Sequence, residues 1–578
     1  MKPLFILRGA AVAAALSALP ANAATYSADV VVYGATSGGI VSAIQAVNEG
    51  KTVELVEPTT HIGGTTTGGL GWVDDGVTSA IGGLSKAFFN TVAAPSPSPV
   101  PTGFSIQSNQ WTVIPSEALA EFQSMLADKS ITVRTGNRLV RGGGGVVKSG
   151  ASITGIHMEN GNIFQGKVFI DATYEGDLMA EAGVSYRVGR ESSAEYGEAL
   201  AGVVGPTIWQ PQQFDYFIDP YVTPGDPGSG LLPYIQEGPL ADPGTADNKT
   251  QAYNFRICLT RSTTPANRVE ITAPAGYDPA KYEILRRYIA SRTTAGQSTV
   301  LSRHLLKISP LHSDLKTDIN NFGPFSTDHI GQNWDYPDGD YATRDAIIQE
   351  HVNFTKGLLW FLKSDPGIPA SIRNDMAAFA YPADEYTGNG NFSPQIYVRE
   401  ARRMVGQYVM KASDIETNDT KTDAIGQGSY GVDSHHVQRL IFPGDYPASP
   451  GSKTDTPPYD RNSAGQLQNE GNFFASEKVY DIPYRAITPQ KAECDNLLVT
   501  FCVSASHIAF GSIRMEPVFM IMGQSAATAA AMAIDQGVAV QDIDYQTLRT
   551  KLKADGQVFS TTGDPPPPGG AGFFGCQP

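Results

Sequence analysis

A stretch near the C-terminal end brings three residues capable of chemistry close together. Residues 504–517 read Ser-Ala-Ser-His-Ile-Ala-Phe-Gly-Ser-Ile-Arg-Met-Glu-Pro, which places His507, Arg514 and Glu516 in one segment. A histidine can take a proton from a hydroxyl or an amine while a hydride leaves the neighbouring carbon, and an arginine can clamp a carboxylate. We therefore predict a catalytic role for His507 and Arg514. In the alternative, His507 only bonds a backbone carbonyl, and Arg514 forms a structural ion pair with Glu516.

A second group of histidines follows Asp433, in the run Asp-Ser-His-His that ends at His436. Adjacent histidines invite a metal interpretation, but neighbours on a strand point to opposite faces, and no further ligand spacing accompanies them. We predict no metal. We expect one of the pair, with His435 as the candidate, to enter a substrate cavity, and the other to be solvated or bonded to the backbone.

The N-terminal region contains the elements of a nucleotide-binding unit. A β-branched run at residues 29–33 precedes Gly-Ala-Thr-Ser-Gly-Gly at 34–39, a helical pattern at 40–49 and a second strand that ends in Glu57. This is the layout of a dinucleotide-binding βαβ unit, in which Gly34 permits the sharp turn and Gly39 lets the helix pack on the strand. Thr36 replaces the middle glycine of the fingerprint. A tight turn in an unrelated α/β sheet is the alternative.

Later segments have the composition of further elements of such a domain. A glycine-rich stretch at residues 61–71 could lay bare backbone against a flat ring system. A buried strand at 168–173 is followed by a helix start, and another buried strand at 496–503 precedes an Ala-rich helix that we place near Gly523.

Taken together, these segments resemble the FAD-dependent oxidoreductase family of glutathione-reductase-like architecture. The resemblance is to the subgroup labelled FAD-dependent oxidoreductase or xanthan-lyase-like protein, many of whose members carry threonine at the position of Thr36. It covers most of the chain after the leader, through residues 31–39, 62–71, 169–178, 251–256, 397–406, 433–435 and 504–517.

The resemblance implies FAD, which we expect to be bound non-covalently because His61 does not match a linkage pattern that we can justify. The glycine turn would receive the pyrophosphate, Glu57 the ribose, residues 63–67 the ribityl chain and isoalloxazine, and the helix near Gly523 would aim its N-terminus at the flavin. For Asp171 and Thr173, helix capping and turn chemistry are the alternative to a cofactor role. The implied cofactor-binding residues are Gly34, Thr36, Ser37, Gly38, Gly39, Glu57, Gly63, Gly64, Thr67, Asp171, Thr173, Glu516, Gly523 and Gln524.

A charged run at Arg399, Glu400, Arg402 and Arg403 fits a single helix. A solvated helix face is the usual outcome for such a run. The family resemblance implies instead that some of these arginines are buried near the pocket.

The fold class that follows is α/β, a Rossmann-like FAD-binding domain with an inserted α+β substrate domain. In this division the flavin domain is split between the two ends of the chain. The expected segments are a signal peptide (1–23), an N-terminal FAD-binding segment (24–183, with a β-meander at 131–165 that turns at the glycines 142–145), the inserted substrate region (184–477, framed by helices at 278–293 and 343–363), a C-terminal FAD-binding segment (478–555) and a disordered tail (556–578).

Composition excludes several classes of protein. A chain of 578 residues with 41% hydrophobic positions should build a large core, and a net charge of −16 without a long basic run argues against nucleic-acid partners. The four cysteines are Cys258, Cys494, Cys502 and Cys576, whose pairing the sequence leaves open. Cys258 and Cys502 lie in strand-like apolar runs that favour buried thiols, whereas Cys494 with Cys576 is a candidate bridge.

The first residues have the composition of a secretory signal peptide. Lys2 and Arg8 precede an apolar run at residues 9–19, and Ala-Asn-Ala at 21–23 is a small-x-small cleavage pattern. The alternative is an uncleaved anchor, but the run is shorter than the roughly 20 residues that a bilayer requires. We expect cleavage after Ala23, a periplasmic or secreted protein, and no stable membrane anchor.

Two functional classes follow from these observations. The first is an exported FAD-dependent oxidoreductase that takes a hydride from a small or carbohydrate-like donor and passes electrons to oxygen or an external acceptor. A single dinucleotide fingerprint is visible, which disfavours a pyridine-nucleotide reductase. The second class is a polysaccharide-associated lyase or a non-catalytic binding protein that retains the flavoprotein fold.

Overall fold

A computed structural model describes residues 23–97, 110–205, 212–312, 315–416, 421–442, 465–475 and 478–559. A five-stranded sheet lies at its centre, with the order β23–β10–β2–β3–β6 and every neighbouring pair parallel. The strands are β2 (Val30–Tyr33), β3 (Val53–Val56), β6 (Val133–Arg134), β10 (Val168–Asp171) and β23 (Leu497–Val499). The predicted Rossmann-like α/β fold is confirmed.

The central strands are apolar throughout because the sheet is covered on both faces. Val30 and Val32 of β2 face α1 (Ser37–Asn48) and α12 (Glu516–Gln536), whereas Val31 and Tyr33 face the opposite way. There they meet Ile153 and other side chains of a second, four-stranded sheet, β1–β9–β8–β7. Its strands are β1 (Thr25–Ser27), β7 (Val146–Ser149), β8 (Ser152–His157) and β9 (Ile163–Gln165).

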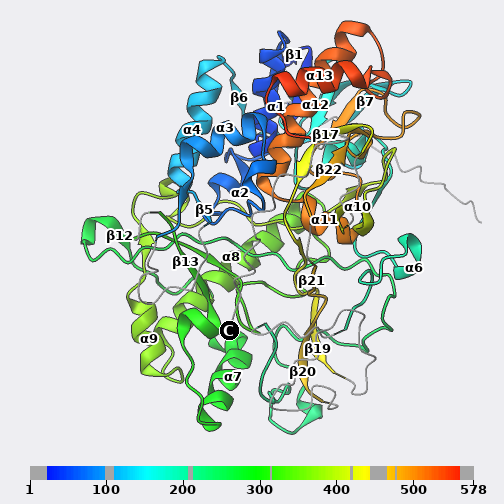
Figure 1. The fold of residues 1–578 in the computed structure, drawn as a ribbon. Helices are drawn as coiled ribbons and strands as arrows, with labels where there is room; N and C mark the ends of the chain where they lie inside the picture. Colours follow the sequence, from blue (N-terminus) through cyan, green and yellow to red (C-terminus); the bar gives the residue numbers. More distant parts are fainter. Residues whose placement is uncertain are drawn as a thin grey trace, which may run out of the picture.

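The two ends of the chain build this domain together, as Figure 1 shows by the blue and red segments at one end of the molecule. Strand β23 pairs with β10, and α12 packs along α1 so closely that a Cβ on Gly523 would lie 2.3 Å from the carbonyl oxygen of Gly38. The hydroxyl of Ser42 donates to the Gly523 carbonyl at 3.0 Å. A small residue is therefore required at this helix crossing.

The intervening segment forms the other half of the molecule, in green and yellow in Figure 1. It contains short antiparallel pairs such as β13 (Lys307–Pro310) with β14 (Thr317–Asn320) and β19 (Gln438–Ile441) with β20 (Leu467–Glu470). Its helices include α7 (Glu283–Thr294), α8 (Tyr341–Ser364) and α9 (Ala370–Ala377). The predicted helices at 278–293 and 343–363 correspond to α7, with a short 3-10 turn before it, and to α8.

An ion cluster around Asp177 joins this half to the domain of the five-stranded sheet. Asp177 begins α5 (Asp177–Glu181) and accepts two hydrogen bonds from Arg344 of α8, at 2.7 and 3.0 Å. Arg402 and Arg141 add further contacts at 2.8 and 3.3 Å. The aspartate and two of the arginines are buried, so the cluster depends on complete pairing.

Two local predictions are wrong. The run Arg399–Arg403 is not a helix: residues 398–402 have no regular secondary structure, and Arg403–Met404 forms β16, which pairs with β11 (Tyr186–Arg187). Each buried charge of this run has a partner in a different segment of the molecule, which a regular helix could not provide. The glycines 142–145 precede β7, and the β7–β8 turn lies at 150–151.

Several predictions lie outside the described residues, including most of the signal peptide, most of the tail and Cys576. The other cysteines are buried and free. Within the described ranges one helix, α12, is long and apolar enough to cross a membrane, but 94% of its most apolar window is buried in the protein. Such burial is typical of a core helix.

Candidate active site

The glycine turn after β2 has the tight geometry that its sequence predicts. Gly34 has a φ of +104°, and a Cβ on it would lie 2.7 Å from the carbonyl of Ala172. A Cβ on Gly39 would lie 1.8 Å from the oxygen of Gly34, so α1 can approach β2 only with glycine there. Thr36 caps α1: its hydroxyl accepts from the Gly39 amide at 3.2 Å and donates to Ala172 at 2.8 Å.

Glu516, the first residue of α12, lies against the start of α1. Its carboxylate accepts hydrogen bonds from the hydroxyl of Ser37, from Thr66 at 2.9 Å and from Tyr174 at 2.7 Å, as well as from Thr65. The first turn of α1 carries no acidic residue of its own. The positive end of the helix dipole and these hydroxyls together favour an anion at this point.

The predicted ribose ligand, Glu57, contacts the same turn. It accepts the Ala35 amide at 2.8 Å and both the amide and hydroxyl of Thr59, at 2.8 and 2.7 Å. Burial raises the pKa of Glu57 to about 7, although these hydrogen bonds oppose the change.

Asp171 and Thr173 bond chiefly to each other and to the chain. Asp171 accepts the amide and hydroxyl of Thr173 at 3.0 and 2.7 Å and the amide of Met179 at 2.8 Å. Burial raises the pKa of Asp171 to about 6. These contacts are those of the helix-capping and turn role that was the alternative to a cofactor role. They hold the turn after β10 in place beside the glycine turn.

The second glycine stretch, residues 61–71, packs against the turn that follows β2. Gly63 and Gly64 have φ values of +87° and +56°, and the Gly63 amide donates to Ala35 at 2.7 Å. The short helix α2 (Gly64–Thr67) follows, with the Thr67 hydroxyl 3.0 Å from Nε2 of His61. The stretch thus brings Thr65 and Thr66 to the carboxylate of Glu516 at the start of α1, whereas Thr67 bonds within the stretch itself.

The start of α12 was predicted wrongly. The helix begins at Glu516 rather than near Gly523, because Pro517 occupies the first turn, where a missing amide costs nothing. Gly523 packs on α1 inside the helix, and the side chain of Gln524 accepts the Leu84 amide at 2.8 Å. The helix end that faces the glycine turn is therefore that of Glu516.

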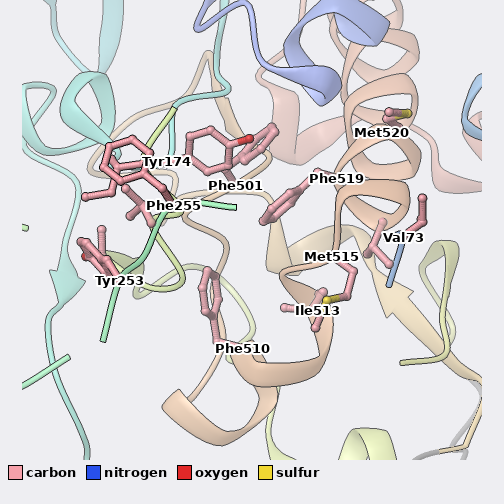
Figure 2. Close-up of a cluster of buried hydrophobic side chains, with 14 of the residues drawn as sticks. Val73, Tyr174, Tyr253, Phe255, Phe501, Phe510, Ile513, Met515, Phe519 and Met520 are labelled. Atoms are coloured by element: carbon pink, nitrogen blue, oxygen red, sulfur yellow. The ribbon is translucent and has the colours of Figure 1, made fainter. Parts of the chain in front are cut away.

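An aromatic cluster covers this helix start, and Figure 2 shows Tyr174, Phe501 and Phe519 within it. Phe501 and Phe519 stack with ring centroids 3.9 Å apart, and Tyr174 meets Phe501 edge-on at 5.0 Å. A Cβ on Gly38 would lie 2.8 Å from the ring of Phe501. The cluster shields the hydroxyls around Glu516 from solvent.

His507, the predicted base, begins α11 (His507–Ile513) just before this region. Its Nδ1 atom lies 2.8 Å from the carboxylate of Glu400, and both side chains are fully buried. Glu400 also pairs with Arg403 at 2.8 Å. Burial alone would raise the pKa of Glu400, but His507 and then Arg403 lower it to about 2. Within the described residues, Nε2 of His507 has no hydrogen-bond partner.

Arg514 ends α11 and contacts the inserted half. It donates to the hydroxyl of Tyr397 at 2.8 Å and to the carbonyl of Asp433 at 2.9 Å, and its ion pair is with the Asp433 carboxylate at 3.3 Å. The predicted alternative of an Arg514–Glu516 ion pair is not what the structure shows, because Glu516 turns to the hydroxyls on α1 and α2.

His435 lies between two carboxylates. Its Nδ1 is 2.8 Å from Asp328, and its Nε2 is 3.3 Å from Asp433. Since Asp433 also contacts Arg514, the structure brings His435 and Arg514 into one cluster. His436 is buried separately, beside Gln213.

Several residues of this region escaped prediction as site residues. Asp328 and Tyr397 carry no local signal that separates them from core residues, and Glu400 was placed on a helix for which a solvated face is the usual outcome. For Tyr174, the only signal was its place directly after the third predicted strand, at the edge where parallel strands deliver side chains to a ligand.

Comparison with known proteins identifies the family. Residues 29–552 match the family described as FAD dependent oxidoreductase. The chain belongs to this family. FAD is thus its cofactor, and the family supports an oxidoreductase rather than a lyase or a binding protein. A search of the curated proteins found no match.

The chain is also similar to parts of several solved structures. One is a geranylgeranyl bacteriochlorophyll reductase-like protein from Thermoplasma acidophilum (17% identity, 28% of this chain and 43% of that chain, TM-score 0.19). A second is a flavin monooxygenase from Stenotrophomonas maltophilia (16% identity, 29% of this chain and 42% of that chain, TM-score 0.18). A third is thioredoxin reductase from T. acidophilum (19% identity, 25% of this chain and 34% of that chain, TM-score 0.16). The chain matches less than half the length of each, and likenesses this low carry no argument about activity.

The donor set around α1 fits FAD in this member of the FAD dependent oxidoreductase family. The start of α1 attracts an anion, since the carboxylate of Glu516 lies there and accepts the hydroxyl of Ser37. A helix start and a hydroxyl that attract this carboxylate can also bind a pyrophosphate. Gly34 to Gly39 with Ser37 would hold the pyrophosphate, Glu57 the ribose, and residues 63–67 the flavin side.

Proposed function

We propose that the chain is an exported flavoenzyme that oxidises a small or carbohydrate-like donor and passes the electrons to oxygen or an external acceptor. The bound FAD would be non-covalent and would accept a hydride from the donor. The observation that carries the proposal is the buried His507–Glu400 pair, whose histidine lies in the segment that leads directly into the helix facing the glycine turn.

His507 is suited to hold the proton that the donor loses. With the Nδ1 hydrogen donated to Glu400, Nε2 carries a free lone pair. When an alcohol donor gives up a hydride from its carbon, its oxygen loses a proton and a carbonyl forms. Nε2 would accept this proton, and Glu400 would orient the ring and stabilise the imidazolium.

Arg514 and His435 would act on the side of the inserted half. Arg514 is held by Tyr397 and Asp433, so its guanidinium has a fixed orientation. His435 is fixed by Asp328 and Asp433. These residues would position the donor, and the aromatic cluster around Tyr174 would exclude water from the cofactor side.

The donor can be found by anaerobic absorbance spectroscopy of the purified protein. Oxidised flavin absorbs visible light and bleaches on two-electron reduction, so a panel of sugars, alcohols and amines should contain at least one compound that bleaches it. A yellow protein that no compound of these classes bleaches would overturn the proposed reaction. Re-admission of air then separates oxygen from an external carrier as the acceptor.

Export is supported by the basic start, short apolar run and Ala-Asn-Ala motif of residues 1–23. The mature protein should begin at Ala24 and accumulate in the periplasm or the medium. N-terminal sequencing of protein purified from each cell fraction tests this, and an intact Met1 would contradict it.

A further inference from the structure

Three guanidinium groups surround the ring of Tyr397, where the two halves of the molecule meet. The central guanidinium carbons of Arg399, Arg514 and Arg256 lie 5.0, 5.7 and 5.9 Å from the ring centroid. All three arginines are buried. A buried charge is costly unless it is paired and hydrogen-bonded, so the partners of each guanidinium group decide what it can do.

The three arginines differ in how completely they are paired. Arg256 donates two hydrogen bonds to Asp318, from Nε at 3.0 Å and from Nη2. The two residues form a structural ion pair. Among the residues that the structure describes, Arg399 has one ion pair, with Asp328 at 2.8 Å, and Asp328 is shared with His435. Arg399 also donates to the carbonyl of Ala252.

Unsatisfied donors remain on the other two. Within the stretches of chain that the structure describes, Nε and Nη2 of Arg399 and Nε of Arg514 are buried without a hydrogen-bond partner. A buried donor left unpaired costs about 1–3 kcal/mol, and more when it is charged. Burial lowers the pKa of Arg399 despite the opposing charge of Asp328, which agrees with incomplete compensation of its charge.

The cluster extends toward solvent at one side. The side chain of Asp433 is 31% exposed, and Asp74 and Tyr430 are also partly exposed. These residues form the rim, and Arg514 with Tyr397 lies beneath it. Two acidic side chains at the rim disfavour a doubly charged group such as phosphate, whereas a singly charged planar group matches the guanidinium edges beyond.

We propose that Arg399 and Arg514 bind a carboxylate group of the donor against the ring of Tyr397. This rests on the proposed function, whose substrate it narrows to carboxylic acids such as hydroxy, amino or sugar acids. Arg399 directly precedes Glu400, which holds His507.

The first test compares matched donors on the holoenzyme under anaerobic conditions. Each acid is paired with its neutral counterpart, for example glucuronate with glucose and lactate with lactamide. We expect the acids to reduce the flavin at least tenfold more efficiently, as kcat/KM. Equal efficiency of acid and neutral partner would overturn the inference while leaving the flavoenzyme proposal intact.

The second test does not depend on turnover. Acetate or benzoate, which flavoenzymes of this kind would not oxidise, is titrated into the yellow protein while the visible flavin spectrum is recorded. We expect a saturable spectral change in the wild type that is weakened at least tenfold in R399Q and partly restored in R399K. The exposed Arg138→Gln should behave as the wild type.

The two tests separate the possible failures. If no donor bleaches the flavin but acetate binds through Arg399, the proposed reaction fails and the anion site stands. If phosphate or sulfate perturbs the spectrum as strongly as acetate, or if R399Q binds acetate like the wild type, the carboxylate site is excluded. Should R399Q not fold, the comparison of acetate with phosphate on the wild type still decides the point.

Discussion

Nδ1 of His507 lies 2.8 Å from the carboxylate of Glu400, and neither side chain is exposed to solvent. The carboxylate accepts from the imidazole and from Gln251 at 3.0 Å, and Arg403 neutralises it. The pair therefore holds one tautomer and one ring orientation, which leaves Nε2 free to accept a proton.

Replacing Glu400 with glutamine should slow flavin reduction about 10- to 100-fold, because the ring of His507 loses its anionic partner. The flavin spectrum of Glu400→Gln should stay that of the wild type, since Glu400 acts through His507. Rates are measured by anaerobic stopped flow, and a shifted pH profile of reduction should accompany the loss. Glu159→Gln, at an exposed position, is the control. A wild-type rate and pH profile in Glu400→Gln would exclude the positioning role.

Removing Asp177 should loosen the contact between the two halves. Asp177→Ala removes the ion-pair partner of the buried Arg344 and leaves the buried Arg402 with the partly exposed Asp338 alone among the described residues, so the free energy of unfolding should fall by about 3–5 kcal/mol. Tm should fall by roughly 3–5 °C in a protein of this size.

The exposed pair Arg138–Asp345 provides the matched control, because its N–O distance of 2.8 Å equals that between Arg402 and Asp177. Asp345→Ala should change the stability by less than about 1 kcal/mol. Equal Tm values for the two variants in differential scanning calorimetry would show that the Asp177 cluster does not join the halves.

The glycine turn should tolerate no side chain at its helix end. Gly39→Ala places a methyl group 1.8 Å from the oxygen of Gly34, so either the turn or α1 must move. We expect a large loss of bound flavin per chain or of soluble protein. Gly388→Ala, where no atom lies within 4 Å of the added methyl group, should be neutral. A yellow, stable Gly39→Ala protein would contradict the packing described for α1.

Burial of Glu57 makes a prediction about pH. Its pKa is raised from 4.5 to about 7, so the folded protein binds a proton that the unfolded chain has released between these values. Stability should therefore fall as the pH rises through this window, by on the order of 3 kcal/mol.

Glutamine at position 57 mimics the protonated form and removes the pH dependence of stability that Glu57 causes. In FAD-free protein, the Tm of Glu57→Gln relative to the wild type should rise between pH 5 and pH 8. The FAD-free form is used so that the ribose does not alter the environment of the carboxylate. A relative Tm that falls over the same range would show that the carboxylate is stabilised by its surroundings.

Local patterns were sufficient for the framework of the fold. β-branched runs, the glycines of the turn and the acid at Glu57 define β2, α1 and β3, because each depends on neighbours in sequence. Strand and helix patterns at the far end of the chain predicted β23 and α12, and the family resemblance assigned them to the same domain.

Partners that are distant in sequence could not be predicted. Arg399, Glu400 and Arg403 have the spacing of a helix, yet each is paired with a residue in another segment, and no local rule encodes such pairing. The start of α12 was missed although Pro517 marks it, because the small residues after Gly523 have the stronger helical composition. Those small residues serve the packing on α1.

The most direct test of catalysis by His507 is the rate of flavin reduction in the wild type and in His507→Ala, measured side by side with the best donor under anaerobic conditions. We predict that both proteins are yellow with the same oxidised spectrum, and that the variant bleaches about 100-fold more slowly, the size of effect that a general base supplies. Equal bleaching rates in the two proteins would contradict the central role of His507.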